Sequence, residues 1–523
     1  MFKKILIALL LVVFGPLLVI EFFGDNLRAL CGMSADSLAG DGPVTARRDS
    51  LMKKSLSNFG GGPGISFAPP GVVNPTVNAK RDALSTFAID VDTASYTWAR
   101  RVIEGGQCPA PEGVRVEEWV NAFDYELPRP SGKPFAVQVD GAVSPFDETK
   151  TLLRVALQGR TIHTAQRKPA HLVFLVDVSG SMNAPDKLPL ARQALRFLSA
   201  QLAPHDTVAL VTYAGSTRVV LKPTPVSDLA TIISGIDSLA SGGGTDMGAG
   251  MQLAYEMAVR DAVPGHTARV IVLTDGDANI GNTSHASMLD AVHAYVKQGV
   301  TLTTVGFGMG DYRADALEQL ADKGNGQALY VDGEKTIERV FGEKLNGTLE
   351  VIARDVKVQV AFDPEVVSTY RLVGYENRDL ADEDFKKDDV DAGELGAGHQ
   401  VTALYELTLT SKRGSLGTVS VRGQLPDSSE VFQLDTDLPR DAVNQSLEQA
   451  SSELRFATAV ALGADLLRGH RPGDWTLEAV AELAEDAARG HEARREFARL
   501  MRSAATNRER TVSARVISDN DGY

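Results

Sequence analysis

The segment LVFLVDVSGSM, residues 172–182, decides the fold of this chain. An apolar strand ends in one carboxylate, Asp177, which two closely spaced hydroxyls follow, Ser179 and Ser181. Such a strand places hard oxygen ligands at the carboxyl edge of a sheet, where α/β proteins bind their ligands. Because these ligands are all oxygen and no imidazole or thiolate stands nearby, the segment predicts a divalent-cation site of the Mg²⁺ type.

The chain around this segment alternates apolar runs with helical runs. Strands are expected at residues 171–177, 207–213, 268–274, 301–307 and 329–332, with a short antiparallel edge strand at 218–221. Helices are expected at residues 187–202, 228–239, 247–259, 285–298 and 314–323. Nearly continuous Val, Ile and Leu runs with helical crossovers indicate a parallel sheet that is covered on both faces. The predicted fold class is therefore α/β, with a doubly wound, mostly parallel sheet.

Two segments of different character flank this domain. The first has amphipathic helices at 98–104 and 114–123, then strands at 135–143 and 151–158. The second has longer alternating strands at 356–362, 401–409, 417–423 and 430–434, then helices within 447–467 and 477–501. Trp119 and Phe123 are expected in the core, and the acidic loop 379–398 carries enough charge to be mobile. These patterns predict an α+β module before the α/β domain and a β-plus-helical module after it.

The 523 residues exceed what one core usually organises, so several domains are expected. The predicted parts are a signal peptide or signal anchor at 1–24, a flexible Gly/Pro-rich linker at 25–80, an N-terminal module at 81–165, the α/β domain at 168–345, and the C-terminal module at 346–515.

The amino terminus has the pattern of an export signal. Lys3 and Lys4 precede an uncharged apolar run, residues 5–20, and a basic end before such a run is typical of a signal peptide or signal anchor. We therefore expect an exported protein, periplasmic or at the cell envelope, with membrane attachment through its N-terminus. Lipidation at Cys31 is an alternative, although the residues before Cys31 lack the small-residue pattern. The sequence leaves open whether the leader is cleaved, lipidated or retained.

Charge and cysteine content exclude some classes of function. The formal net charge of -15 argues against a nucleic-acid partner, because basic surface and counterion release drive polyanion binding. The two cysteines, Cys31 and Cys108, are too few for a disulfide framework and lack the spacing of a zinc site.

Two further pieces of sequence complete the proposed cation site. A glycine triplet, residues 242–244, precedes Thr245 and Asp246, and such a triplet allows close backbone approach and aims the next hydroxyl. Asp275 follows the strand expected beside the first and returns a carboxylate to the same edge. In this order, the motifs DxSxS, GTD and TDG resemble the von Willebrand factor A (VWA) family with its metal-ion-dependent adhesion site.

The resemblance implies the roles of these residues. It makes Ser179, Ser181 and Thr245 the hydroxyl ligands, and Asp177 and Asp275 the acids that hold the ion directly or through water. It implies Mg²⁺ as the ion, with Mn²⁺ or Ca²⁺ as alternatives. Neutral hydroxyls leave the charge of the ion under-neutralised, so the site would bind an Asp or Glu of a protein partner. Asp246 and Asp277 are expected to support the ligands or to cap helices.

The resemblance extends beyond the α/β domain. Residues 87–96 and 114–118 are similar to the N-terminal extension of the bacterial YfbK-type proteins, and the segment after residue 341 is similar to their C-terminal domain of unknown function. It covers most of the chain from about residue 81 to residue 507.

The predicted function is metal-dependent protein binding at the cell envelope, without catalysis. One alternative is a metal-dependent phosphohydrolase of the haloacid-dehalogenase type, with Asp90 as nucleophile and Asp92 assisting, although that pattern wants Thr or Val where Ala94 stands. Another is an architectural protein with an empty site. Neither Ser179 nor Ser181 has a His partner at a recognisable spacing, so nucleophilic catalysis has no support. The identity of the partner, the role of the C-terminal domain and the oligomeric state do not follow from the sequence.

Overall fold

A computed structural model describes residues 73–523 except 131, 146, 164–165, 264, 277–284, 309–313, 389, 391, 427–429, 444, 471–472 and 521–523. The predicted export signal, Cys31 and most of the predicted linker therefore lie outside the described residues. Within the described ranges, no helix is both long enough and apolar enough to cross a membrane.

The central element is a six-stranded sheet in the order β10-β9-β8-β5-β6-β7. Its strands are β5 (Ala170–Asp177), β6 (Thr207–Tyr213), β7 (Thr217–Pro225), β8 (Thr267–Thr274), β9 (Val300–Phe307) and β10 (Ala328–Val331). All neighbours are parallel except β7, which pairs antiparallel with β6 at the edge. The predicted mostly parallel sheet with an antiparallel edge strand is confirmed.

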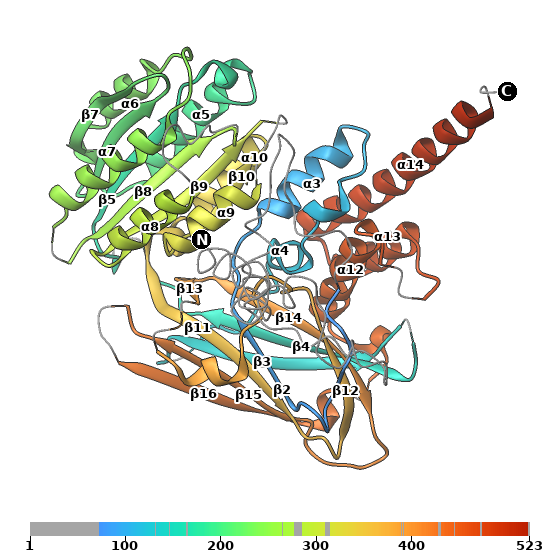
Figure 1. The fold of residues 1–523 in the computed structure, drawn as a ribbon. Coiled ribbons are helices and arrows are strands. Elements are labelled where there is room, and N and C mark those ends of the chain that lie inside the picture. The colour runs from blue at the N-terminus through green and yellow to red at the C-terminus, as the bar shows by residue number, and fades with distance from the viewer. Residues whose placement is uncertain are drawn as a thin grey trace, which may run out of the picture. The chain divides into compact units, whose positions relative to one another are not determined.

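Helices cover both faces of this sheet (Figure 1). They are α5 (Leu188–Gln201), α6 (Leu229–Asp237), α7 (Met247–Arg260), α8 (His285–Val296), α9 (Ala314–Lys323), α10 (Glu334–Glu338) and α11 (Leu345–Leu349). Alternate residues of β5 enter two different cores: Leu172 and Phe174 pack with α5 and α6, whereas Val173 and Leu175 pack with α7 and α9. A strand with period-two side chains that is apolar on both faces must be covered twice, so the fold is a doubly wound α/β fold.

The two flanking segments build shared sheets. One sheet has the order β1-β12-β14-β4-β3, and the other has the order β13-β11-β15-β16 with β2 also paired to β11. The segment before the α/β domain gives β1 (Val77–Asn78), β2 (Leu84–Ala88), β3 (Phe135–Val143) and β4 (Lys150–Gly159). The segment after it gives β11 (Val351–Phe362), β12 (Val367–Val373), β13 (Gly393–Gly396), β14 (Gln400–Leu409), β15 (Gly417–Gln424) and β16 (Val431–Leu438). The two flanking segments, predicted as separate modules, are thus hydrogen-bonded to each other, and the α/β domain is inserted between them in the chain.

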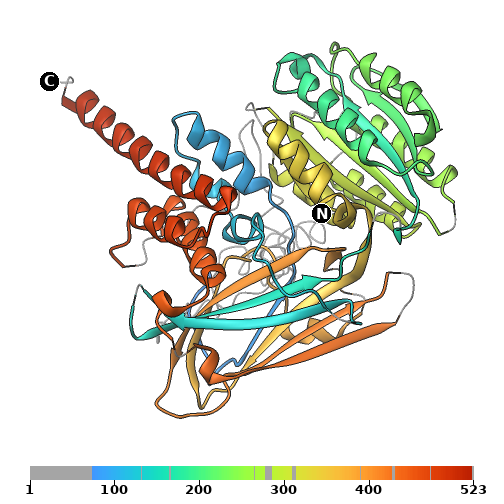
Figure 2. The ribbon, with the colours of Figure 1, turned by 180° about the vertical axis from the view of Figure 1, so that it is seen from behind.

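The helices of the flanking segments also pack together (Figure 2). They are α3 (Ala94–Glu104) and α4 (Val116–Asn121) from the first segment, and α12 (Ser452–Leu467), α13 (Leu477–Asp486) and α14 (Glu492–Asn520) from the second. The Phe123 ring, just after α4, lies 4.9 Å from the Phe456 ring of α12 and 5.7 Å from the Phe497 ring of α14, measured between centroids. Trp119 is fully buried in the same cluster. The prediction that Trp119 and Phe123 are core residues is confirmed.

The acidic loop is more structured than its charge predicts. It contains a short 3₁₀ helix (Asp382–Lys386) and β13, and Phe385 is buried. The Lys357 ammonium of β11 donates to the backbone carbonyl of Asp384 at 3.1 Å. The described residues of the loop therefore have defined structure, with one buried aromatic ring and one contact to Lys357 of β11, and the expected mobility stays a prediction.

If the two flanking segments form one body, Phe123 and Phe456 must be energetically coupled. We expect Phe123→Ala and Phe456→Ala each to lower the free energy of unfolding by about 3–5 kcal/mol, and the double variant to depart from additivity by about 0.5–1.5 kcal/mol, because the rings are in edge-to-face contact. Chemical denaturation of the four proteins gives this cycle. Phe123→Ala combined with Phe362→Ala, which lies in a different core cluster, is the control and should be additive. Strict additivity of the Phe123 and Phe456 changes would contradict a shared core.

Candidate metal site

Strand β5 delivers a fully buried carboxylate to the carboxyl edge of the sheet. Asp177 is 0% exposed, and its Oδ1 accepts the Ser179 N–H at 2.8 Å. Its Oδ2 accepts the Tyr213 hydroxyl at 3.1 Å and the Thr274 hydroxyl at 3.0 Å. Tyr213 and Thr274 are the last residues of β6 and β8, the two strands that flank β5. The orientation of Asp177 is thus set by three adjacent strand ends.

The two serine hydroxyls lie side by side beyond Asp177. Ser179 Oγ and Ser181 Oγ are 2.9 Å apart, and Ser179 is almost fully buried whereas Ser181 is half-buried. Met182, at 0% exposed, anchors this turn in the core. Two oxygen atoms at this spacing can bind one cation together, because hydroxyls are acceptors as well as donors.

Backbone hydrogen bonds tie the glycine-rich loop to the serine turn. Gly180 N–H donates to the Gly243 carbonyl at 3.2 Å, and Gly242 N–H donates to the Val178 carbonyl at 2.7 Å. Gly243 has φ +93°, a left-handed backbone conformation that other residues rarely adopt, so glycine suits this position. Thr245 is half-buried in this loop. The loop that carries Thr245 is therefore held against the turn that carries Ser179 and Ser181.

Asp246 and Asp275 are two further acids of the candidate site. Asp246 is the N-cap of α7 and accepts the Ala249 N–H at 3.2 Å, which confirms its predicted capping role. Asp275 follows β8 and is 1% exposed, and its Oδ2 accepts the Lys187 ammonium at 2.8 Å. Burial raises the pKa of Asp177 above its usual range, and the nearby charge of Asp275 raises that pKa further. A cation held by these two acids would relieve both effects. Asp277 lies outside the described residues.

The donor set suits a hard divalent ion. Asp177, Ser179, Ser181 and Asp275 come to one sheet edge, and the loop with Thr245 is bonded to it. In the described part of the chain, no group of three or more His, Cys, Asp or Glu side chains could hold a metal. The predicted set holds only two acids, so it depends on its hydroxyls, and all-oxygen ligands match Mg²⁺. The metal roles of the five residues stay a prediction.

Sequence reasoning missed three residues that contact the carboxylates of this site. Tyr213 and Thr274 fix Asp177, and Lys187 contacts Asp275. Thr274 stood inside the TDG motif, and Tyr213 ends the neighbouring strand, so strand pairing would have indicated both. Nothing in the local sequence indicates the contact of Lys187.

Asp90 and Asp92, the acids of the phosphohydrolase alternative, lie in a second cluster. Both are buried, at 3% and 2% exposed. Asp92 Oδ1 accepts the N–H of Ala328 in β10 at 2.9 Å. The Arg378 guanidinium lies 3.4 Å from each carboxylate, and 2.9 Å from Asp322 of α9. This arrangement joins the VWA sheet to the flanking body and leaves both acids already engaged by the chain itself.

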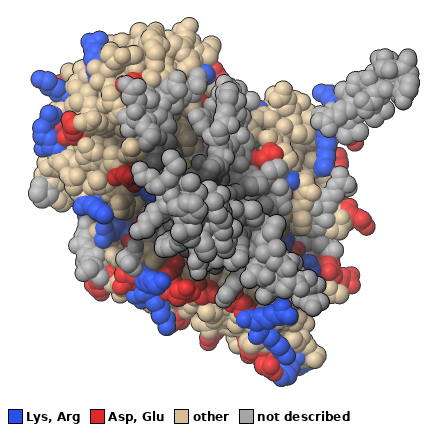
Figure 3. Space-filling model, in the orientation of Figure 1, with Lys and Arg blue, Asp and Glu red and all other residues tan. Residues whose placement is uncertain are grey.

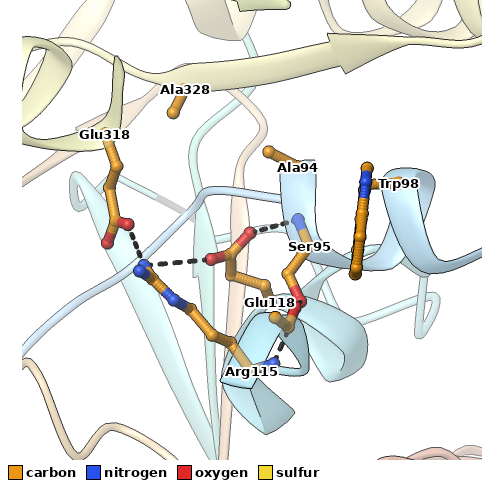
Figure 4. A pocket seen from close by; sticks show the side chains of 8 residues that line it. Ala94, Ser95, Trp98, Arg115, Glu118, Glu318 and Ala328 are labelled. Atoms are coloured by element: carbon orange, nitrogen blue, oxygen red, sulfur yellow. Dashed lines mark hydrogen bonds and ion pairs between the residues drawn. The ribbon is translucent and has the colours of Figure 1, made fainter. Parts of the chain in front are cut away.

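Arg115 forms the other half of this cluster, beside a small pocket (Figure 4). Its guanidinium bridges Glu118 of α4 and Glu318 of α9, and the second oxygen of Glu118 accepts the Ser95 N–H at 2.8 Å. Burial raises the pKa of Glu118 to about 8, opposed by Arg115 and reinforced by Glu318. Burial likewise raises the pKa of Glu117 to about 7. The junction contains more acids than guanidiniums. Its acids are Asp90, Asp92, Glu117, Glu118, Glu318 and Asp322, and its guanidiniums are those of Arg115 and Arg378. The junction therefore retains protons near neutral pH.

Comparisons with known proteins define the class. Residues 171–343 match the von Willebrand factor type A domain family, and residues 71–154 match a family described as von Willebrand factor. Residues 347–506 match the family described as the C-terminal part of the uncharacterised protein YfbK. The chain is therefore a VWA-domain protein, and these matches support a protein-interaction or adhesion scaffold as its broad function.

The relatives narrow this class to a family. The chain is 35% identical to the uncharacterised protein YfbK of Escherichia coli over 424 residues, which is 76% of this chain and 73% of that protein. The chain belongs to the YfbK family. It is also 27% identical to the bovine (Bos taurus) inter-alpha-trypsin inhibitor heavy chain H4, over 37% of this chain and 22% of that protein. A solved von Willebrand factor type A structure from Catenulispora acidiphila aligns with a TM-score of 0.45 at 17% identity, over 72% of this chain and 91% of that chain.

The raised pKa of Glu118 makes stability depend on pH. The folded protein holds this proton up to about pH 8, and an unfolded glutamate loses it near the ordinary value of 4.5. The stabilisation that this proton gives is therefore complete below the pKa of the unfolded state and is lost as the pH rises through the pKa of the folded state. The free energy of unfolding falls by up to about 1.4 kcal/mol per pH unit for each proton. We expect Glu118→Gln, which keeps an oxygen acceptor for Ser95 N–H, to make this loss shallower between pH 6 and 8.

Denaturation curves across this pH range measure the slope. The exposed Glu448→Gln change removes the same charge elsewhere and should leave the slope as in the wild type. An equal slope in the wild type and in Glu118→Gln would show that Glu118 does not hold the proton.

Proposed function

We propose that this protein is a metal-ion-dependent protein-binding scaffold of the bacterial cell envelope. Asp177, Ser179, Ser181, Thr245 and Asp275 would hold one divalent cation, Mg²⁺ in the first place, with Mn²⁺ or Ca²⁺ as alternatives. The observation that supports this most is the pair of serine hydroxyls 2.9 Å apart beside a buried, pre-oriented carboxylate.

The chemistry of the partner follows from the charge of the ligand set. Five oxygen ligands leave one position of a six-coordinate ion open. Where the two acids act through water, the direct ligands are neutral hydroxyls, and the ion keeps an affinity for a further anionic oxygen. A carboxylate from an Asp or Glu side chain of another protein fits this position. Nucleic acid is not expected, because the chain has a net charge of -15 and the visible described surface mixes acidic and basic side chains (Figure 3).

We propose binding without catalysis. The phosphohydrolase alternative needs Asp90 free to attack a phosphoester, whereas Asp90 is buried and paired with Arg378. The network around Asp90 supports a structural role at the junction with the VWA sheet. Metal-dependent hydrolysis of a generic phosphoester that Asp90→Asn abolishes would overturn this part of the proposal.

Metal-dependent capture of a partner tests the proposal. The purified protein, immobilised and exposed to an envelope extract of its own organism, should retain a partner in Mg²⁺ and release it in chelator. Asp177→Asn should lose the partner, since the amide removes one charge from the ligand set while keeping its shape. Mg²⁺ should also raise the melting temperature of the wild type but not of Asp177→Asn.

Asp237→Asn is the matched control, because Asp237 is an exposed acid at the end of α6 in the same domain, and its carboxylate pairs with Arg196 rather than with a residue of the site. It should retain both the capture and the stabilisation by Mg²⁺. A retained set of proteins that neither chelator nor Asp177→Asn changes would argue against the metal-mediated mechanism.

The location is a proposal from residues 1–24, which lie outside the described residues. Two lysines before an uncharged apolar run support export with attachment through the N-terminus. A C-terminally tagged full chain should sediment with membranes. Its tag should become sensitive to added protease once the outer layer of the cell envelope is permeabilised. Deletion of residues 1–24 should move the protein to the cytoplasmic fraction. A full chain that stays in the cytoplasm would contradict the proposed location.

A further inference from the structure

Lys187 brings a positive charge into the candidate metal site. Its ammonium donates to Asp275 Oδ2 at 2.8 Å, and its side chain is only 15% exposed. Asp275 is one of the two acids in the predicted ligand set, so a chain-borne cation already contacts a proposed ligand of the metal. An ammonium and a Mg²⁺ ion that both approach this carboxylate would repel each other.

The chain holds Lys187 in this position from several sides. The Lys187 carbonyl accepts the Ala191 N–H at 2.8 Å, which begins α5. The lysine stem lies over the turn after β9, where a Cβ on Gly308 would come within 2.6 Å of Lys187 Cε. The preceding residue, Asp186, is ion-paired with Arg101 of α3. The lysine is thus packed along a defined path between the ends of β8 and β9.

We propose that Lys187 is an internal counter-cation of the metal site, which a divalent ion must displace from Asp275 in order to bind. This inference rests on the proposed metal-binding function. Without metal, the ammonium compensates part of the charge of Asp177 and Asp275 and stabilises the site. When metal binds, the ion pair between Lys187 and Asp275 is broken. The free energy needed to break it makes metal binding weaker.

Removal of the ammonium should therefore strengthen metal binding. Calorimetric titration with MgCl₂ should give a dissociation constant about tenfold lower for Lys187→Met than for the wild type, in line with the loss of one partly buried ion pair. Methionine keeps an unbranched stem over Gly308. Lys187→Arg keeps the charge and should bind Mg²⁺ no more tightly than the wild type.

Lys222→Met provides the matched control, because it removes one exposed lysine from β7 of the same sheet. It should leave the dissociation constant unchanged, which separates the local ion pair from a general change in net charge. Circular dichroism of each variant checks that it is folded.

A second measurement uses the unaltered protein. Acylation of lysines by a water-soluble ester, read by mass spectrometry, should modify Lys187 faster in MgCl₂ than in chelator, while Lys222 is modified equally in both. Equal Mg²⁺ affinity of the wild type and Lys187→Met, with unchanged labelling of Lys187, would overturn the inference and leave the proposed function standing. Absence of Mg²⁺ binding in both the wild type and Lys187→Met would overturn the inference and the proposed function together.

Discussion

The candidate site depends on one buried carboxylate at the end of the central strand. Asp177 is inaccessible to solvent, and burial of an ionised group is costly unless hydrogen bonds or a counter-charge compensate it. Its partners come from the next residues of its own loop and from the final residues of both neighbouring strands. The carboxylate therefore fixes the relative positions of three strand ends, and the serine turn and glycine loop are built upon that edge. The proposed cation would reduce the same cost.

The flanking segments form a body to which the VWA sheet is attached through charge. Arg115 and Arg378 reach acids on α9, and Asp92 accepts a backbone N–H of β10. An ionic junction of this kind is stable only when its charges are balanced, because the desolvation of each ion must be offset by its partners. Protons on Glu117 and Glu118 supply part of that balance. The junction lies beside α3, whose Arg101 is ion-paired with Asp186, the residue before Lys187, so the flanking body contacts the loop that enters the candidate metal site.

Prediction from sequence was most complete where the information is local. The six predicted strands and five predicted helices of the VWA domain lie within a few residues of observed ones, because buried parallel strands have continuous apolar runs and their helices have a clear period. The short helices α10 and α11 were not predicted. The flanking sheets were predicted less well. Strands β1, β2, β12 and β13 were missed, and no local pattern showed that β4 pairs with β14 or β2 with β11. Those pairings join residues more than two hundred positions apart, and their partners are selected by packing over the whole body.

The sequence by itself determined the α/β class, the carboxylate and hydroxyls at the strand ends, and the order of the three motifs that place the chain in its family. These depend on residue type and on short spacings. Only the tertiary structure decided that Tyr213 and Thr274 orient Asp177, that Lys187 contacts Asp275, and that the segments before and after the VWA domain form common sheets. Each of these is a contact between distant parts of the chain. Such contacts depend on the order of the strands in the sheet and on the direction that a long side chain takes. Local sequence patterns encode neither of these.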